Sequence, residues 1–175
     1  GSMPYHLSMY LSSPTEVVER ELPIMLEGCG YVPDTGGPGR HRGSLAVYRS
    51  YRFLADGDLF FRTVTSNANP YGLAGGGDGT PGEAYLIRDG KRIDLPRVSV
   101  AELKVKAGDV FYQCQRGAGG YGDPFEREPS RVLDDVLNDK ISAAYAERMY
   151  GVAVDLAAGR VDQARTTALR HGRAA

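Results

Sequence analysis

The sequence predicts an α+β fold: a mainly antiparallel β domain with glycine-rich loops, a short N-terminal helix and a C-terminal helical appendage. Segments rich in Val and Tyr with strand-like alternation run up to residue 114, and segments with helical periodicity follow residue 124. Between them, residues 117–122 hold four glycines in six positions and are followed by Asp123-Pro124. This stretch fits neither a strand nor a helix, because glycine is entropically costly in both and proline lacks an N–H donor. Strands and helices in separate runs are typical of α+β rather than alternating α/β folds.

The N-terminal part begins with an expected strand and a short helix. Residues 4–13 carry apolar side chains at period two, as a strand does, but no turn signal precedes them. Ser13 as N-cap, Pro14 at the first helical position and Glu16 three residues after the cap predict a helix of about two turns. Pro23 ends it.

Further strands are expected over residues 24–32, 44–54, 59–65, 83–88, 91–95, 98–105 and 110–114. Gly28 and Gly30 interrupt the first of these and suit a bulge. Asp56-Gly57 and Asp89-Gly90 are hairpin signals, and the strands on either side of Asp56-Gly57 form the clearest antiparallel pair in the sequence.

Helices are expected from Pro129 or Ser130, from the cap residue Ser142 to Tyr150, and from the cap residue Asp162 to near His171. Gly151 stops the second helix, and residues 152–154 and 160–161 form a small ribbon. Residues 1–3 look like the remnant of a cleaved tag. We therefore expect residues 4–124 to form a β-rich domain and residues 125–175 a helical C-terminal appendage packed on it, as one structural unit.

Composition excludes several classes of protein. The 21 Lys and Arg residues nearly balance the 22 Asp and Glu residues, which gives no electrostatic footprint for nucleic acid or an anionic membrane surface. No apolar run is long enough to span a bilayer and no signal peptide is evident, so a soluble, cytoplasmic chain is expected. The two cysteines are expected as buried free thiols, and the three histidines share no ligand spacing, so no metal site is expected in this chain.

The glycine-rich stretches are candidates for phosphate-binding loops. Glycine-rich turns between a strand and a helix can present several N–H groups to an anion. However, neither Lys nor a hydroxyl residue follows the glycines of residues 117–122 as a P-loop requires, and the dinucleotide-binding pattern is absent as well. The interpretation favoured is a structural loop packed against another chain or domain.

Candidate side chains for chemistry are few. Arg40-His41-Arg42 is the best local candidate for contact with an anionic group, because arginine presents a rigid fork to carboxylate or phosphate. The alternative is a solvated or interface-facing cluster that pairs with Asp34 or a partner's carboxylate. Asp134-Asp135 on the second expected helix is interpreted as a solvated face, and no nucleophile–base pair stands out.

Together, these motifs resemble the C-terminal part of hydantoinase B/oxoprolinase proteins. The resemblance covers about residues 12–155 and rests on residues 14–19, 33–43, 48–52, 72–76, 81–82, 106–110, 117–124, 134–136 and 150–152. It departs from the family pattern at residues 66–69, where the family tends to carry a charged pair, and at Arg116, where the family prefers a small residue or proline.

The resemblance implies a two-component, ATP-dependent system. In it, an A-type subunit binds nucleotide and phosphorylates a cyclic amide or an enolised ketone, and a B-type subunit completes hydrolysis or carboxylation. The family's metal-binding residues lie in an N-terminal part that this sequence does not contain. No cofactor is therefore expected in this chain, whereas ATP, Mg and a divalent metal are expected on partner subunits.

Two hypotheses follow. In the first, the chain is a small subunit or C-terminal portion that completes a hydantoinase-B-like component, with a larger hydantoinase-B-type fragment and a hydantoinase-A-type ATP-binding subunit as partners. In the second, it is a stand-alone binding module that kept the family fold without its catalysis. The candidate binding or interface residues are Asp34, Arg40, His41, Arg42, Arg116, Gly119, Gly120, Tyr121 and Asp123. Arg116 and Asp123 are the charged members of the last glycine stretch.

Overall fold

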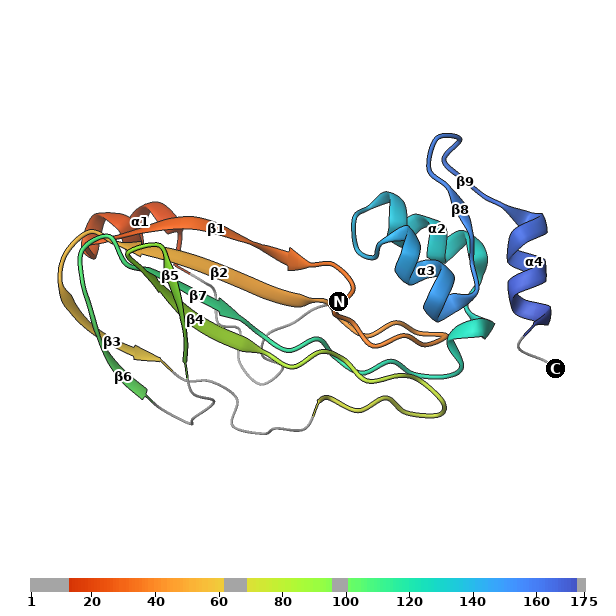
Figure 1. The fold of residues 1–175 in the computed structure, drawn as a ribbon, viewed down its shortest axis with the longest axis horizontal. Coiled ribbons are helices and arrows are strands. Elements are labelled where there is room, and N and C mark those ends of the chain that lie inside the picture. Colours follow the sequence, from red (N-terminus) through yellow and green to blue (C-terminus); the bar gives the residue numbers. More distant parts are fainter. Residues whose placement is uncertain (1–12, 62–68, 96–100, 173–175) are drawn as a thin grey trace. The chain divides into compact units, whose positions relative to one another are not determined.

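The structure, a computed structural model, describes residues 13–61, 69–95 and 101–172 (Figure 1). Its helices are α1 Thr15–Glu21, α2 Pro129–Leu137, α3 Ala143–Tyr150 and α4 Gln163–His171, with a 3-10 turn η1 Pro124–Glu126. Its strands are β1 Ile24–Val32, β2 Ala46–Phe53, β3 Gly57–Phe61, β4 Glu83–Arg88, β5 Lys91–Asp94, β6 Ala101–Val105, β7 Val110–Cys114, β8 Val154–Asp155 and β9 Arg160–Val161. The predicted α+β class is confirmed. None of the helices described is long and apolar enough to cross a membrane.

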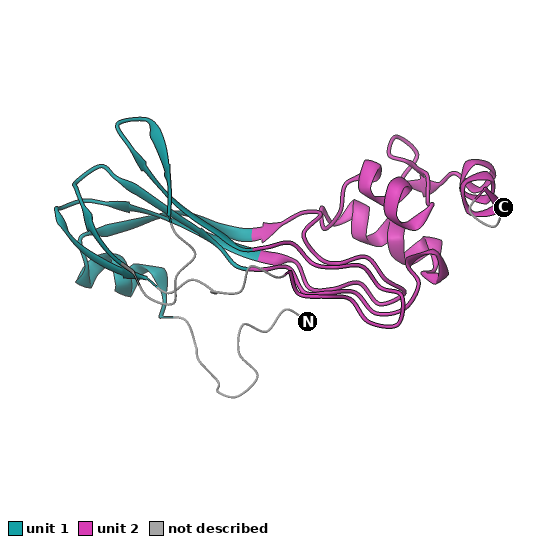
Figure 2. Ribbon diagram, turned by 60° about the horizontal axis from the view of Figure 1, so that its bottom comes forward, with its two compact units in different colours: residues 1–30, 47–67, 82–115 teal, residues 31–46, 68–81, 116–175 magenta. Residues whose placement is uncertain are grey.

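The chain forms two compact units, shown in teal and magenta in Figure 2. Unit 1 comprises residues 1–30, 47–67 and 82–115, and unit 2 comprises residues 31–46, 68–81 and 116–175. Each unit therefore combines segments that lie far apart in the sequence.

Unit 1 is built on a five-stranded sheet in the order β1-β2-β7-β4-β5. Strand β7 pairs antiparallel with β2 and with β4, and β4 pairs antiparallel with β5. The predicted hairpin at Asp89-Gly90 is confirmed: it joins β4 to β5, and both residues adopt positive φ, as a two-residue hairpin turn requires.

The hairpin predicted at Asp56-Gly57 is wrong. Strand β3 pairs with β6 in a separate ribbon, in the register Leu59↔Leu103, while β2 lies between β1 and β7. This pairing places Phe61 and Val105 in the same buried cluster as Leu86 and Phe111. The local turn signal is thus overridden by burial of apolar side chains from distant strands. The strand predicted over residues 4–13 lies outside the described residues, except for Ser13.

Stacked tyrosines line one face of the five-stranded sheet. Tyr112 of β7 lies between Tyr48 of β2 and Tyr85 of β4, with ring centroids 5.6 and 4.5 Å away. The Arg92 guanidinium lies 3.9 Å from the Tyr85 centroid. A side chain at Gly28 or Gly30 would meet the Tyr48 ring at 3.3 Å. Burial alternates regularly along β1, so these glycines are explained by close approach to Tyr48 rather than by the expected bulge.

A buried ion pair anchors the turn before β7. The Asp109 side chain is 3% exposed and accepts hydrogen bonds from Arg88 Nη2 at 2.6 Å and Nε at 3.0 Å, and from the Lys106 backbone N–H at 2.8 Å. Hydrogen bonds from Arg88 hold the pKa of Asp109 below its ordinary value. The Lys106–Asp109 segment is therefore a carboxylate-centred clamp.

This clamp predicts a specific pH dependence. A carboxyl whose pKa is lowered in the folded state stabilises that state above its unfolded pKa of about 4 and loses this contribution as pH falls through the folded value. We expect Asp109→Asn to lower the free energy of unfolding by about 2–3 kcal/mol at pH 7. The difference from the parent protein should shrink below about pH 4, as measured by urea unfolding from pH 7 to pH 3. Asp94→Asn, at a side chain 75% exposed, is the control and should change stability by less than about 1 kcal/mol. If the difference in free energy of unfolding between Asp109→Asn and the parent protein stays constant with pH, the lowered pKa of Asp109 is contradicted.

The helices of unit 2 largely follow their sequence signals. The Ser142 hydroxyl caps α3 by accepting from Tyr145 N–H, Gly151 ends it at φ 60°, and Asp162 caps α4. The predicted ribbon is confirmed as β8 with β9, with its first strand at Val154–Asp155 rather than at residues 152–154. Helices α2 and α3 bury a cluster comprising Val132, Val136, Ile141, Tyr145, Ala146, Tyr150 and Val152. The cap predicted for α1 is wrong, because Pro14 occupies the N-cap position and no side chain caps that helix.

Candidate functional site

Three glycine-rich segments of unit 2, residues 35–46, 70–81 and 116–122, pack into one body, which we call the glycine bundle. Each segment hydrogen-bonds to both others through the backbone. Gly37 N–H donates to Ala118 O at 2.8 Å, Gly77 N–H to Pro38 O at 2.7 Å, and Gly120 N–H to Gly77 O at 2.9 Å. The stretches that read as separate loops in the sequence are therefore neighbours in a single hydrogen-bonded arrangement.

The glycines of the bundle serve close backbone approach. A Cβ atom would come within 3.0 Å of backbone atoms at Gly36, Gly37, Gly39, Gly43, Gly72, Gly76, Gly79, Gly117, Gly119 and Gly120. None of these ten residues adopts positive φ, so the requirement is space rather than a left-handed conformation. Collagen uses glycine for the same reason at its crowded axis. The last glycine stretch, which was expected to pack against another chain or domain, packs here against two other segments of the same unit.

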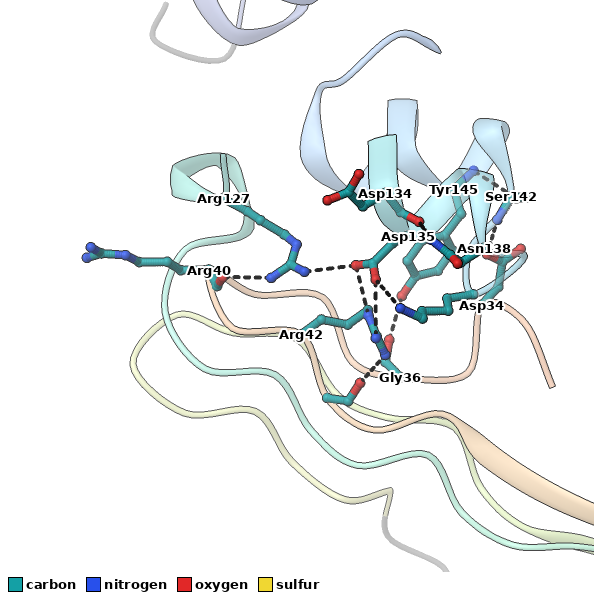
Figure 3. A network of polar contacts seen from close by, with 12 residues as sticks. Asp34, Gly36, Arg40, Arg42, Arg127, Asp134, Asp135, Asn138, Ser142 and Tyr145 are labelled. Atoms are coloured by element: carbon teal, nitrogen blue, oxygen red, sulfur yellow. Dashed lines mark hydrogen bonds and ion pairs between the residues drawn. The ribbon is translucent and has the colours of Figure 1, made fainter. Parts of the chain in front are cut away.

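A buried carboxylate joins the bundle to the helices within unit 2 (Figure 3). Asp135 of α2 is 5% exposed at its side chain. Its Oδ2 accepts from Arg42 Nε at 3.1 Å and from Arg127 Nη2 at 2.8 Å, and Lys140 Nζ lies 3.8 Å from Oδ1. The two arginines are 15% and 11% exposed. We call Arg42, Arg127 and Asp135 the arginine–aspartate cluster.

One further nitrogen of each guanidinium in this cluster donates to a backbone carbonyl. Arg42 Nη1 donates to Gly43 O at 2.7 Å, and Arg127 Nη1 donates to Arg40 O at 3.0 Å. The positive charge of Arg42 is thus paired inside the protein. Arg42 pairs with Asp135 rather than with Asp34.

The expectation that Asp135 lies on a solvated face is wrong. Val132, Asp135 and Val136 are all buried, which places the carboxylate in the apolar stripe of α2, whereas Asp134 is exposed. The i, i+3, i+4 spacing of these three residues was the available signal. A charged residue within such a stripe requires a partner, and the arginines of residues 40–42 could have been proposed as that partner.

A second contact joins the bundle to α3. Asp34, at φ 62°, accepts from the Ser142 N–H at 2.7 Å, and its own N–H donates to Lys140 O at 3.2 Å. The Tyr145 hydroxyl donates to Gly36 O at 3.1 Å. Burial raises the pKa of Tyr145, so its hydroxyl keeps the proton that it donates.

The other candidate residues lie at different places in the bundle. Arg40 is 62% exposed and lies 3.8 Å from Glu126. His41 pairs with Tyr121, with ring centroids 6.2 Å apart. Arg116 is partly buried at the start of the third segment, and Asp123 caps η1 by accepting from Phe125 N–H at 2.9 Å. The structure thus brings together Arg40, His41 and Tyr121, while Arg42 faces the cluster.

Gly119 and Gly120 both lie at close backbone approaches of the bundle. A Cβ atom at Gly119 would overlap the backbone of Tyr71, and one at Gly120 would overlap the backbone of Pro38. These glycines therefore have a packing role. Among the described residues, no three His, Cys, Asp or Glu side chains gather in a way that could hold a metal ion.

Unit 2 also has an open cleft of about 550 Å³, lined by Phe125, Ala144, Glu147, Arg148, Gly151 and Leu169. Its acidic group is engaged, since Glu147 pairs with Arg165 at 2.7 Å. The Arg148 guanidinium lies 5.6 Å from the Tyr145 ring. Within unit 2, the carboxylates of Asp135 and Glu147 are thus both engaged by arginines of the same unit.

Comparison with known proteins identifies the family of this scaffold. The family model for hydantoinase B/oxoprolinase matches residues 1–124. The chain belongs to the hydantoinase B/oxoprolinase family. The resemblance inferred from the sequence motifs is thus confirmed, and the glycine bundle accounts physically for several of the motifs that carried it.

The chain is also similar to individual known proteins. The chain is 38% identical over 144 residues to an uncharacterised protein of Methanocaldococcus jannaschii, which covers 82% of this chain and 25% of that protein. It is 26% identical to the acetone carboxylase alpha subunit of Xanthobacter autotrophicus, covering 89% of this chain and 25% of the subunit. The crystal structure of an ATP-dependent caprolactamase from Pseudomonas jessenii matches with a TM-score of 0.77 and 27% identity, covering 92% of this chain and 28% of that chain. This hydantoinase B-like chain thus spans about a quarter of the length of these relatives.

Proposed function

We propose that this chain is a small subunit or C-terminal portion of a hydantoinase-B-type component in a cytoplasmic, ATP-dependent complex that hydrolyses a cyclic amide or carboxylates a ketone. In this proposal, the chain completes the structure of the component and its substrate-handling surface and has no catalytic activity alone. Its partners are a larger hydantoinase-B-type polypeptide and a hydantoinase-A-type ATP-binding subunit. ATP, Mg and a divalent metal are bound by those partners.

The observation that carries the proposal is the combination of family membership with coverage. The matched part of the acetone carboxylase alpha subunit is 25% of that subunit, and the matched part of the caprolactamase chain is 28%. The described residues of this part hold a glycine scaffold and the arginine–aspartate cluster, whose members pair with one another. About three quarters of each of these relatives therefore lies outside the matched part, which supports a completing role over an autonomous one.

The proposal is tested by reconstitution with the larger hydantoinase-B-type polypeptide and the hydantoinase-A-type subunit of the source organism. ATP hydrolysis is measured with hydantoin, 5-oxoproline, caprolactam, or acetone plus bicarbonate. We expect substrate-stimulated ATP hydrolysis only when all three polypeptides are present, at least about tenfold above any pair, because a scaffold missing from a site removes its positioning. Equal activity without this chain, or turnover by this chain alone, would refute the proposal.

A further inference from the structure

The side chains of His41, Leu73 and Tyr121 lie side by side across the three segments of the glycine bundle. Tyr121 is the middle residue: it exchanges backbone hydrogen bonds of 2.9 Å with His41 on one side. On the other side, Leu73 N–H donates to Gly120 O and Gly122 N–H donates to Leu73 O, both at 2.9 Å. His41 pairs antiparallel with Tyr121 and Leu73 pairs parallel with it. Residues directly opposite in such bridges carry their side chains on the same side, so the three side chains form a row.

The row is exposed to solvent. Tyr121 and Leu73 are each 56% exposed, Tyr71 two residues before Leu73 is 74% exposed, and His41 is exposed as well. Single exposed apolar residues are ordinary, but a contiguous group of them marks an interaction surface. We call His41, Tyr71, Leu73 and Tyr121 the aromatic row.

The backbone beneath the row is fixed before any partner arrives. Tyr71 O packs directly against Gly119, and Gly76 packs against the backbone of Gly120 and Tyr121. A surface that is already ordered loses little entropy on binding, and tyrosine is enriched among the residues that contribute most to binding energy. The ion pair of Arg40 and Glu126, both 62% exposed, follows next to His41 and supplies polar groups of the kind found at an interface rim.

We propose that the aromatic row is the docking surface for the larger hydantoinase-B-type polypeptide. This inference rests on the proposed function. The matched relatives contain about three times more chain than the matched quarter, and in them this scaffold is one part of a longer polypeptide. Three of the four side chains in the row are large and mainly apolar, so the matching surface on the partner is mainly apolar. A second copy of this chain is the competing occupant.

The test compares two row variants with a matched control. Leu73→Asp and Tyr121→Asp place a charge in the row at side chains 56% exposed, and Leu156→Asp places one at a side chain 61% exposed in the β8–β9 turn of the same unit. Because all three side chains are exposed, each variant should fold, which circular dichroism and urea unfolding will check. The probe is the tagged larger hydantoinase-B-type polypeptide of the source organism, with affinity measured by calorimetry.

We expect each row variant to bind the larger polypeptide at least about tenfold more weakly and the control to bind within about twofold of the parent chain. Equal binding by all three variants would overturn the docking inference while leaving the proposed function intact. Failure of the parent chain itself to bind would refute the proposed function. Self-association that Leu73→Asp abolishes, with partner binding unchanged, would assign the row to a second copy and overturn the proposal.

Discussion

Gly43→Ala is expected to destabilise the chain by at least about 3 kcal/mol, or to prevent folding, because the new methyl group has no space. A Cβ atom at Gly43 would come within 3.0 Å of the backbone of Ala118 and Gly119 in another segment of the bundle. These contacts are with backbone atoms, which no rotamer change can move. Relief would require separating the segments, which would also stretch the 2.9 Å hydrogen bond from Ala118 N–H to Ser44 O.

The matched control is Gly57→Ala at the start of β3. No atom lies within 4 Å of a Cβ at Gly57, and its φ is not in the left-handed region. This substitution should therefore change stability by less than about 0.5 kcal/mol, or raise it slightly through the unfolded chain. Urea unfolding followed by circular dichroism measures both variants. A loss below about 1 kcal/mol at Gly43 would show that the bundle is looser than the contacts imply.

Asp135→Ala is expected to lower the free energy of unfolding by about 3–5 kcal/mol, because it leaves two buried guanidinium groups without their carboxylate. Arg42 and Arg127 are 15% and 11% exposed and both bind Asp135 Oδ2. Their other hydrogen-bond acceptors are backbone carbonyls, which carry no full charge to balance them. The loss should therefore exceed that of a surface ion pair several-fold.

The neighbouring Asp134→Ala provides the control, since Asp134 is exposed on the same helix and should change stability by less than about 1 kcal/mol. Chemical unfolding of both variants gives the comparison. A double-mutant cycle with Arg42→Met then isolates the pairwise contribution. If both aspartate substitutions lower the free energy of unfolding equally, the buried ion pairs of Asp135 contribute no more to stability than an exposed aspartate does.

Local signals in the sequence predicted those elements whose cause is local. The hairpin at Asp89-Gly90, the Ser142 and Asp162 caps and the Gly151 stop each depend on a few neighbouring residues, and the structure has them all. The pairing of β3 with β6 depends on burial of apolar side chains about forty residues apart in the sequence. A turn dipeptide such as Asp56-Gly57 carries no information about that burial.

The candidate site likewise combines features that the local sequence predicts with features that depend on distant residues. Arg40, His41, Arg42 and Tyr121 stood out because of residue type, but only the fold shows that Arg42 faces Asp135 while Tyr121 lies between His41 and Leu73. The glycine stretches have no hydrophobic period, so a pattern search reads them as loops. Their packing depends on the absence of side chains in three distant segments at once, which no single window of sequence displays.

The glycine bundle has a thermodynamic consequence. Its interior consists largely of peptide groups that bond to one another, as in the links from Gly37 to Ala118 and from Gly120 to Gly77. Exposing apolar surface raises the heat capacity of the unfolded state, whereas exposing polar surface lowers it. An apolar core makes the free energy of unfolding curve strongly with temperature. A core built from amides contributes little to this curvature. The contribution of the bundle to the free energy of unfolding is therefore retained at low temperature, where burial of leucine and phenylalanine side chains is less favourable.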